Sequence, residues 1–349
     1  MRQPATWWRP PSEMRQGTMT ETSTPVAAQP SALSRSFNLR DYGVVLGAVA
    51  LVIYLSLSTT TFLTTGNLTN VLDQAVVVGL LACGATMCII SGVFDLTATA
   101  SLALSAIIGV EVTQAAGVEA GFVAAVLAGA GLGALTGFIV NVSTAVNAFI
   151  ATLATSIVYR GVALVITGGA ITYPLTDQLD GVQVFTDDVP GLGITVATGT
   201  LLVVAVVMGV MLWATNFGRR VYAVGGNAEA ARLSGIRVGS VHIGVYMASG
   251  VCSALAGLVL VARSGGGAQA NMALGLELSA IAAAVIGGTS ILGGEGAIWR
   301  GMVGVLLLTL ISNGFNLLGW DTTFQQVVQG CLILVAIITD RYIRRVRST

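Results

Sequence analysis

The reactive side chains of this sequence do not gather into an arrangement that catalyses a reaction. All sixteen basic residues are arginine, so there is no lysine for a phosphate-binding P-loop or for Schiff-base chemistry. The four cysteines, Cys83, Cys88, Cys252 and Cys331, lie in apolar segments without the spacing of metal ligands, and we interpret them as small core residues. The single histidine, His242, follows a basic loop and is typical of a helix end. The sequence therefore predicts no enzyme active site, cofactor or metal.

Charged side chains within apolar segments offer a second kind of chemistry. A charge at the centre of a membrane helix costs roughly 2.5–3.5 kcal/mol on insertion scales, so such residues often mark ion or substrate pathways. Only Arg160 falls well inside an apolar segment, whereas Asp95 and Glu277 lie near expected helix ends. We therefore expect no buried carboxylate for proton or sodium coupling. For Arg160 we favour capping of helix carbonyls over lining a translocation path, and both Arg160 and Asp95 are candidates for such a path.

A polar island at 218–239 separates two long apolar blocks and holds four of the sixteen basic residues. By the positive-inside rule, this island faces the cytoplasm. Asn227 can cap a helix that has Glu229 in its first turn, and Gly235 is placed as a left-handed stop. The pattern predicts a helix of about two turns over 227–234, presented by Gly225 and Gly226. It suits docking of a soluble partner; the alternative is a loop that only connects two spans.

Composition determines the class of protein. The 349 residues are 54% hydrophobic and 9% charged, with a mean hydropathy of +0.85, whereas soluble domains are roughly 25% charged. A spanning helix needs about 20 mostly apolar residues. We therefore predict an all-α polytopic membrane protein with about ten transmembrane helices, some short or broken by glycine, and a short cytoplasmic helix. The spans are expected at 42–58, 71–91, 97–114, 121–141, 148–168, 194–214, 240–262, 278–293, 298–318 and 325–340.

Charge asymmetry predicts the topology. Arg35 and Arg40 precede the first span, and the loop 169–193 carries four aspartates but no arginine. Ten spans with both chain ends in the cytoplasm satisfy the positive-inside rule. The expected domains are a disordered cytoplasmic tail (1–36), a transmembrane domain (37–341) containing the cytoplasmic loop 215–239, and a basic cytoplasmic tail (342–349).

Glycines mark two further features. Gly129, Gly133 and Gly137 recur every four residues, which predicts a small-residue face for close helix packing. The segment 277–301 is rich in glycine at membrane depth, where broken backbone requires protein or a cavity beside it. A similar interruption lies at 91–97, and paired interruptions are typical of transporters with an internal duplication. The candidates for the translocation path in the glycine-rich segment are Gly287, Gly288, Gly293 and Gly294.

Four motifs, in order, resemble one known family. They are A-F-I-A-T-L-A-T-S-I-V-Y-R-G (148–161), Y-A-V-G-G-N-A-E-A-A-R-L-S-G-I (222–236), A-I-A-A-A-V-I-G-G-T-S-I-L-G-G-E-G (280–296) and N-G-F-N-L-L-G (313–319). From about residue 40 to its end, the chain is similar to the ribose, xylose and arabinose permeases of ATP-binding-cassette (ABC) importers. The region 91–101 departs from the family pattern, with one extra residue before Asp95 and no glycine after it.

The resemblance implies a monosaccharide permease in the inner membrane of a prokaryote. It also implies a permease dimer, surrounded by lipid, with a separate ABC ATPase subunit inside and a periplasmic or lipid-anchored sugar-binding protein outside; no nucleic-acid partner is expected. The residues that match the family's ATPase-coupling loop are Gly225, Gly226, Asn227, Glu229, Ala230, Arg232, Leu233, Ser234 and Gly235. The alternatives are an ABC permease for a nucleoside, an autoinducer or a branched-chain amino acid, and a secondary carrier.

Overall fold

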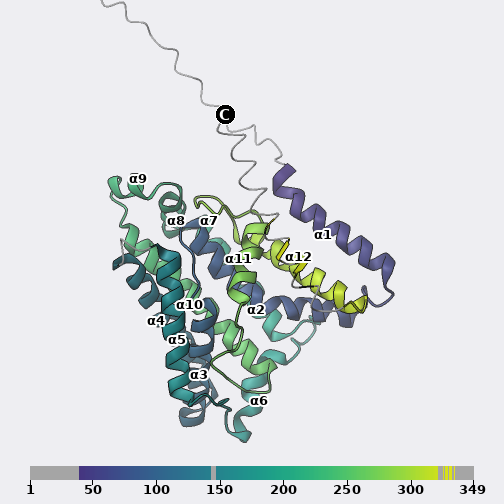
Figure 1. Ribbon diagram of the computed structural model, residues 1–349. Helices are drawn as coiled ribbons and strands as arrows, with labels where there is room; N and C mark the ends of the chain where they lie inside the picture. Colours follow the sequence, from purple (N-terminus) through teal and green to yellow (C-terminus); the bar gives the residue numbers. More distant parts are fainter. Residues whose placement is uncertain are drawn as a thin grey trace, which may run out of the picture. The chain divides into compact units, whose positions relative to one another are not determined.

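The fold is all-helical in the residues that the computed structural model describes, which are 39–142, 147–320 and a few positions between 325 and 334 (Figure 1). The longer helices are α1 (Leu39–Ser58), α2 (Thr65–Ile90), α3 (Ala98–Ala116), α4 (Val118–Val142), α5 (Ala148–Thr167), α7 (Val196–Ala214), α10 (Val238–Arg263) and α12 (Ile298–Leu317). The shorter ones are α6 (Leu179–Val182), α8 (Asn216–Gly226), α9 (Ala228–Leu233) and α11 (Leu276–Ile286), with 3-10 turns at Thr176–Gln178 and Gln183–Thr186.

Seven of these helices are long and apolar enough to cross a membrane, and Val44–Ser58 and Leu276–Ile286 are shorter apolar helices. The polytopic all-α prediction is therefore confirmed. Nine expected spans each overlap one of these helices. The expected span 278–293 is wrong in extent, because α11 ends at Ile286 and the backbone then runs irregularly to the start of α12. The tenth expected span and both expected tails fall wholly or mostly outside the described residues.

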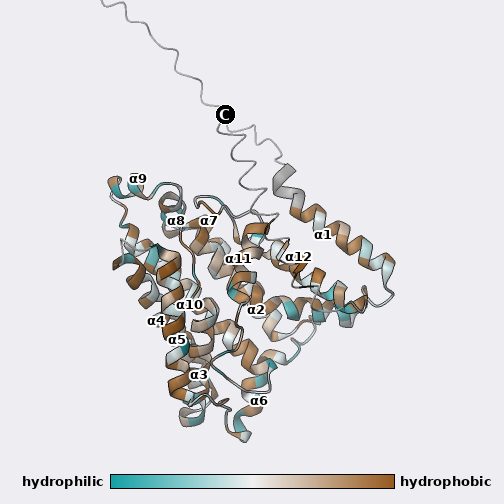
Figure 2. Cartoon of the chain, in the orientation of Figure 1, coloured by the Kyte–Doolittle hydropathy of each residue, from teal (hydrophilic) through white to brown (hydrophobic). Residues whose placement is uncertain are grey.

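Burial divides the long helices into an inner and an outer group. The most apolar window is 83% buried in α2 and 72% buried in both α3 and α10, but only 28% buried in α5 and α7. Large apolar side chains are accordingly exposed along α5 and α7, as a surface beside lipid or another apolar partner requires. Figure 2 shows hydrophobic residues distributed along the ribbons of the long helices. Three of the cysteines are buried as expected, whereas Cys331 is exposed.

The predicted small-residue face is confirmed between α4 and α10. A methyl group added at Gly129 would overlap the Gly250 carbonyl oxygen, and one added at Gly133 would overlap the Tyr246 carbonyl oxygen. Gly137 is similarly close to the Ile243 backbone. These glycines let the two helices approach at backbone distance, which fixes α10 against its neighbours.

The elements between the long helices lie at opposite ends of the helical unit. Figure 1 shows α8 and α9 at one end and α6 at the other. On the side of α6, Thr172 and Ala268 exchange backbone hydrogen bonds of 2.9 and 2.8 Å, which join the loop after α5 to the loop after α10. The loops 169–193 and 215–239 thus lie at opposite ends of the helical unit, and their placement on opposite sides of the membrane stays a prediction.

Candidate functional site

The polar island folds into two consecutive helices rather than one. Thr215 accepts a hydrogen bond from the Gly218 amide at 3.1 Å and so caps α8. α8 buries Val221 and Val224 against the helical unit. The sequence prediction missed α8, because the two glycines at its end are poor helix formers and favoured a linker.

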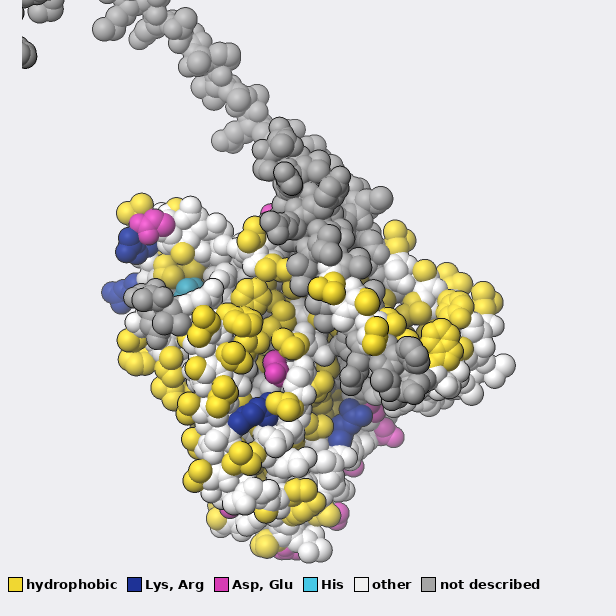
Figure 3. Space-filling view, viewed as in Figure 1, with side chains coloured by type: hydrophobic (Ala, Val, Ile, Leu, Met, Phe, Trp, Pro, Cys, Tyr) yellow, Lys and Arg dark blue, Asp and Glu magenta, His cyan; other side chains and the backbone are white. Residues whose placement is uncertain are grey.

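The second helix, α9, is the predicted one. The Asn227 side chain accepts from the Ala230 amide at 2.9 Å, and Gly235 ends the helix at a φ of +84°. Arg232 donates to Glu229 at 2.7 Å on the exposed surface. Ala231 is buried, whereas Leu233 is 79% exposed. α9 is thus a short capped helix that presents a large apolar side chain outward, together with the acidic and basic side chains gathered at this end in Figure 3.

Gly225 and Gly226 come directly before the α9 cap, as the sequence prediction placed them, and are also the last two residues of α8. A methyl group at Gly225 would overlap the Ile90 carbonyl oxygen at the end of α2 and come within 2.7 Å of the Gly294 amide. A methyl group at Gly294 would come within 2.8 Å of the Gly226 Cα atom. Backbone therefore packs against backbone where α8, α2 and the segment after α11 meet. We call the glycines at this meeting point the glycine junction: Gly92, Gly225, Gly226, Gly293 and Gly294.

The break after α11 is held mainly by its backbone. The Gly294 amide donates to the Ile90 carbonyl at 2.8 Å, and the Tyr222 hydroxyl of α8 donates to the Gly296 carbonyl at 2.8 Å. Burial raises the pKa of the Tyr222 hydroxyl, so this group stays protonated and able to donate. Gly288 and Gly293 adopt φ values of +97° and +85°, which glycine tolerates best. Gly287 is buried against the Arg300 carbonyl.

The break between α2 and α3 is held by a carboxylate. Asp95 is only 4% exposed, so the expectation of no buried carboxylate is wrong. One oxygen accepts from the Thr97 amide at 2.8 Å and from its hydroxyl at 2.6 Å, and the other accepts from Ser249 at 2.7 Å. These bonds satisfy the buried carboxylate and tie the break to α10. The sequence placed Asp95 near a helix end, but could not show that α10 covers that end.

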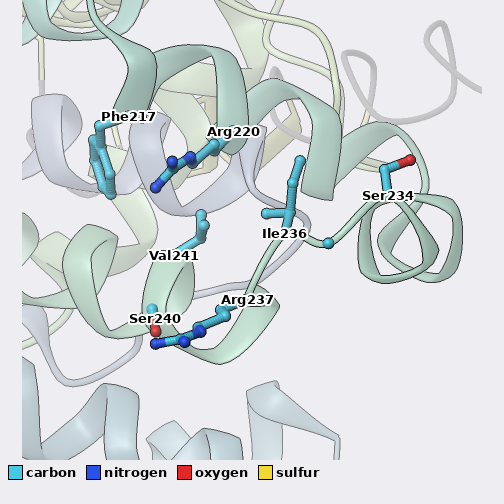
Figure 4. A pocket seen from close by; sticks show the side chains of 8 residues that line it. Phe217, Arg220, Ser234, Ile236, Arg237, Ser240 and Val241 are labelled. Atoms are coloured by element: carbon cyan, nitrogen blue, oxygen red, sulfur yellow. The ribbon is translucent and has the colours of Figure 1, made fainter.

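A pocket of about 510 Å³ lies where α8 meets the start of α10. Figure 4 shows Arg220 and Arg237 reaching over it from different elements, with Ile236 and Val241 between them. The pocket combines an apolar floor with two guanidinium groups and lies next to α9, so it suits an anionic group.

Arg160 takes part in a hydrogen-bond cluster that the sequence did not reveal. Its guanidinium donates to the Ala270 carbonyl and to the Thr99 hydroxyl, each at 2.8 Å, and Thr99 donates to Glu277 at 2.6 Å. The expected capping of helix carbonyls is wrong in its partner, because Ala270 lies in the loop between α10 and α11. Thr99 and Glu277 were missed as its partners because they lie 61 and 117 residues away in sequence.

Comparisons with known proteins agree with this architecture. The family model described as the permease component of branched-chain amino acid transport systems matches residues 67–337. The chain belongs to this permease family. The chain is also similar to the ribose import permease protein of Bacillus subtilis strain 168, 40% identical over 308 residues, which are 87% of this chain and 93% of that protein.

Two further relatives come from Escherichia coli K12. The ribose import permease protein is 38% identical over 302 residues, 85% of this chain and 92% of its own length. The D-allose transport system permease protein is 38% identical over 301 residues, 85% of this chain and 90% of its own length. No solved structure matches the chain. The resemblance expected from the four motifs is therefore confirmed, and the chain is a multi-pass membrane component of a transport system.

Proposed function

We propose that this chain is the permease subunit of a prokaryotic ABC importer and that it translocates a monosaccharide, a ribose-like pentose or a related sugar. The observation that carries the proposal is the 38–40% identity to ribose and allose permeases over most of both chains. The family description also includes branched-chain amino acid transport, and that solute, a nucleoside or an autoinducer are the alternatives. The sugar is favoured because the cited relatives that match along most of their length are sugar permeases.

In this proposal the permease lies in the inner membrane as a homodimer surrounded by lipid. A separate ABC ATPase subunit acts at the cytoplasmic side, and a periplasmic or lipid-anchored sugar-binding protein delivers the sugar outside. The exposed apolar side chains of α5 and α7 provide the surface that lipid or a second permease copy covers.

The ATPase contact is assigned to α9 and the pocket beside it. Leu233 and Ala230 are exposed for contact, while Asn227 and Gly235 fix the two ends of the helix. The adjacent pocket, with Arg220 and Arg237, complements an acidic side chain of the ATPase. The remaining coupling residues, which keep this helix in place or lie on its surface, are Gly225, Gly226, Glu229, Arg232 and Ser234.

The glycine junction supplies a route from that contact to the translocation path. α8 ends against both chain breaks, so a displacement of α9 reaches them through packed backbone rather than through flexible side chains. In the proposal, the backbone beside the path includes Gly287, Gly288, Gly293 and Gly294, and Asp95 anchors the opposite break. Arg160 contributes a side chain to the path itself.

A secondary carrier remains the rival from another class of transporter. Burial of Asp95 removes one argument against a carrier, since a buried carboxylate is a feature that carriers use. Both Asp95 oxygens, however, accept hydrogen bonds from fixed neighbours. The exposed α9 helix and the membership of the permease family favour the ABC importer.

The proposal is tested by purifying the chain with its ATPase and binding protein, identifying the sugar bound to the latter, and measuring ATP-dependent uptake of that sugar into proteoliposomes. Leu233→Asp should lower ATPase association at least about tenfold, because it places a charge in an apolar contact. The matched control is Leu192→Asp, which changes a leucine that is 67% exposed in the loop before α7 and should not alter ATPase association. Uptake without ATP, or equal ATPase association in both variants, contradicts the proposal.

A further inference from the structure

A charged cluster lies where three helices of the spanning region meet, and it has hydrogen-bonding capacity left over. It consists of Arg160 on α5, Thr99 in the first turn of α3, and Glu277 in the first turn of α11. Arg160 lies about 18 Å along the 20-residue helix α5 from Ala148. The cluster is therefore near the middle of a candidate membrane span rather than at its end.

The bonds within the cluster use only part of what its side chains offer. Arg160 has five N–H donors. One terminal nitrogen donates to the Ala270 carbonyl and the other terminal nitrogen donates to Thr99. Glu277 accepts from Thr99 at 2.6 Å and from the Gly275 amide at 3.0 Å, both on the same carboxylate oxygen. Its other oxygen accepts no hydrogen bond from the described part of the chain. The Arg160 guanidinium thus keeps unused donors and the Glu277 carboxylate keeps an unused acceptor, with the Thr99 hydroxyl between them.

Two of the three cluster residues are partly exposed. Thr99 is buried, but Arg160 and Glu277 are each half-buried, and the neighbouring Ile157 and Leu278 are 67% and 56% exposed. Figure 3 shows a few acidic and basic side chains among the hydrophobic and other side chains of this face. Charges at this depth are too costly to face hydrocarbon, so this surface faces an aqueous path or a protein partner.

We propose that Arg160, Thr99 and Glu277 form a contact site for a neutral polyol within the translocation path, an inference that rests on the proposed sugar importer. The opposite charges balance, so the site has no net charge to attract an ion. Adjacent hydroxyl groups of a monosaccharide each donate and accept a hydrogen bond, and so match a carboxylate oxygen beside guanidinium donors. Transient contacts of this kind suit a path, from which the sugar must also leave.

The test uses the complete transporter in proteoliposomes, with saturating sugar-loaded binding protein, and measures sugar uptake and ATP hydrolysis together. Glu277→Gln should lower uptake of D-ribose, D-allose or L-arabinose about tenfold, because a charged acceptor is replaced by a weaker one. ATP hydrolysis stimulated by the binding protein should stay within about twofold, so the amount of sugar moved per ATP falls. Thr99→Val should act in the same direction, and Thr99→Ser, which keeps the hydroxyl, should restore most of the uptake.

The matched control is Glu119→Gln, which changes an exposed glutamate in the first turn of α4 and should leave sugar moved per ATP unchanged. A purely structural role for the cluster predicts that uptake and hydrolysis fall together, and that result overturns the inference. Unchanged uptake in Glu277→Gln overturns it too. Failure of the proposed function is recognised separately in the unmutated transporter: uptake of leucine but of no sugar rejects a polyol as the ligand.

Discussion

The two breaks in the helical pattern, 91–97 and 287–297, meet at the same place but are held in different ways. The first has a single glycine, Gly92, and is fixed by side chains around Asp95. The second has five glycines and is fixed mainly by backbone hydrogen bonds, including that from the Gly294 amide to Ile90. A break held by side chains fails when one acceptor is lost, whereas a break held by backbone fails when a neighbour gains a single carbon atom.

The largest effect is expected at the break held by side chains. Asp95→Leu leaves the buried Thr97 amide and two hydroxyls without their acceptor, and each unsatisfied donor costs about 1–3 kcal/mol. Because the hydroxyls can rotate to other partners, we expect a total loss of about 3 kcal/mol. Thermal unfolding in detergent should show a marked decrease in the melting temperature and a loss of assembled transporter.

Ser249→Ala serves as the graded comparison, since it removes only one of the three hydrogen bonds to Asp95. Its cost should be about 1 kcal/mol. A melting temperature for Asp95→Leu no lower than that for Ser249→Ala would show that the carboxylate does not hold this break.

The next effect is expected where both breaks meet α8. Gly225→Ala adds a methyl group that overlaps the Ile90 carbonyl oxygen, so α8 must move away from the junction at a cost of about 1–3 kcal/mol. Sugar uptake, compared at matched membrane abundance, should fall even where the protein stays folded, because the displaced helix leads directly to α9.

Gly226→Ala is the matched control for this substitution, because a methyl group at Gly226 meets no atom within 4 Å. It should leave the melting temperature close to that of the unmutated protein. An equal fall in melting temperature in the two variants would mean that glycine is needed there for backbone freedom, and not for the close approach at Gly225.

Local signals account for what could be predicted from the sequence. Apolar length predicted the spanning helices, the spacing of Gly129, Gly133 and Gly137 predicted the α4–α10 contact, and Asn227 with Gly235 predicted both ends of α9. Each signal lies within or directly beside the element that it describes. Such a signal can be recognised from the sequence because it depends on residues that are close together along the chain.

The features that could not be predicted depend on contacts between distant residues. Asp95 is buried because Ser249, 154 residues later, lies over it. Gly225 resembles a linker residue, but it is required where three backbones meet. Glu277 resembled a charge at a helix end until the fold placed Thr99 and Arg160 beside it. No local pattern contains this information, because each pairing arises only when the chain folds.

The smallest effect is expected at α9, which lies beyond the glycine junction and contacts mainly α8 and α10. Asn227→Ala removes the side chain that accepts from the Ala230 amide and should destabilise α9 by about 1 kcal/mol. The folded chain should keep its melting temperature, since neither break depends on α9. ATPase affinity, measured on the reconstituted complex, should fall about fivefold, because the helix is less often formed when the partner arrives.

Asn227→Asp keeps an acceptor at the same position and should bind the ATPase nearly as well as the unmutated permease. If Asn227→Ala instead lowers the melting temperature as much as Gly225→Ala does, α9 is part of the junction and not a separate docking helix attached to it.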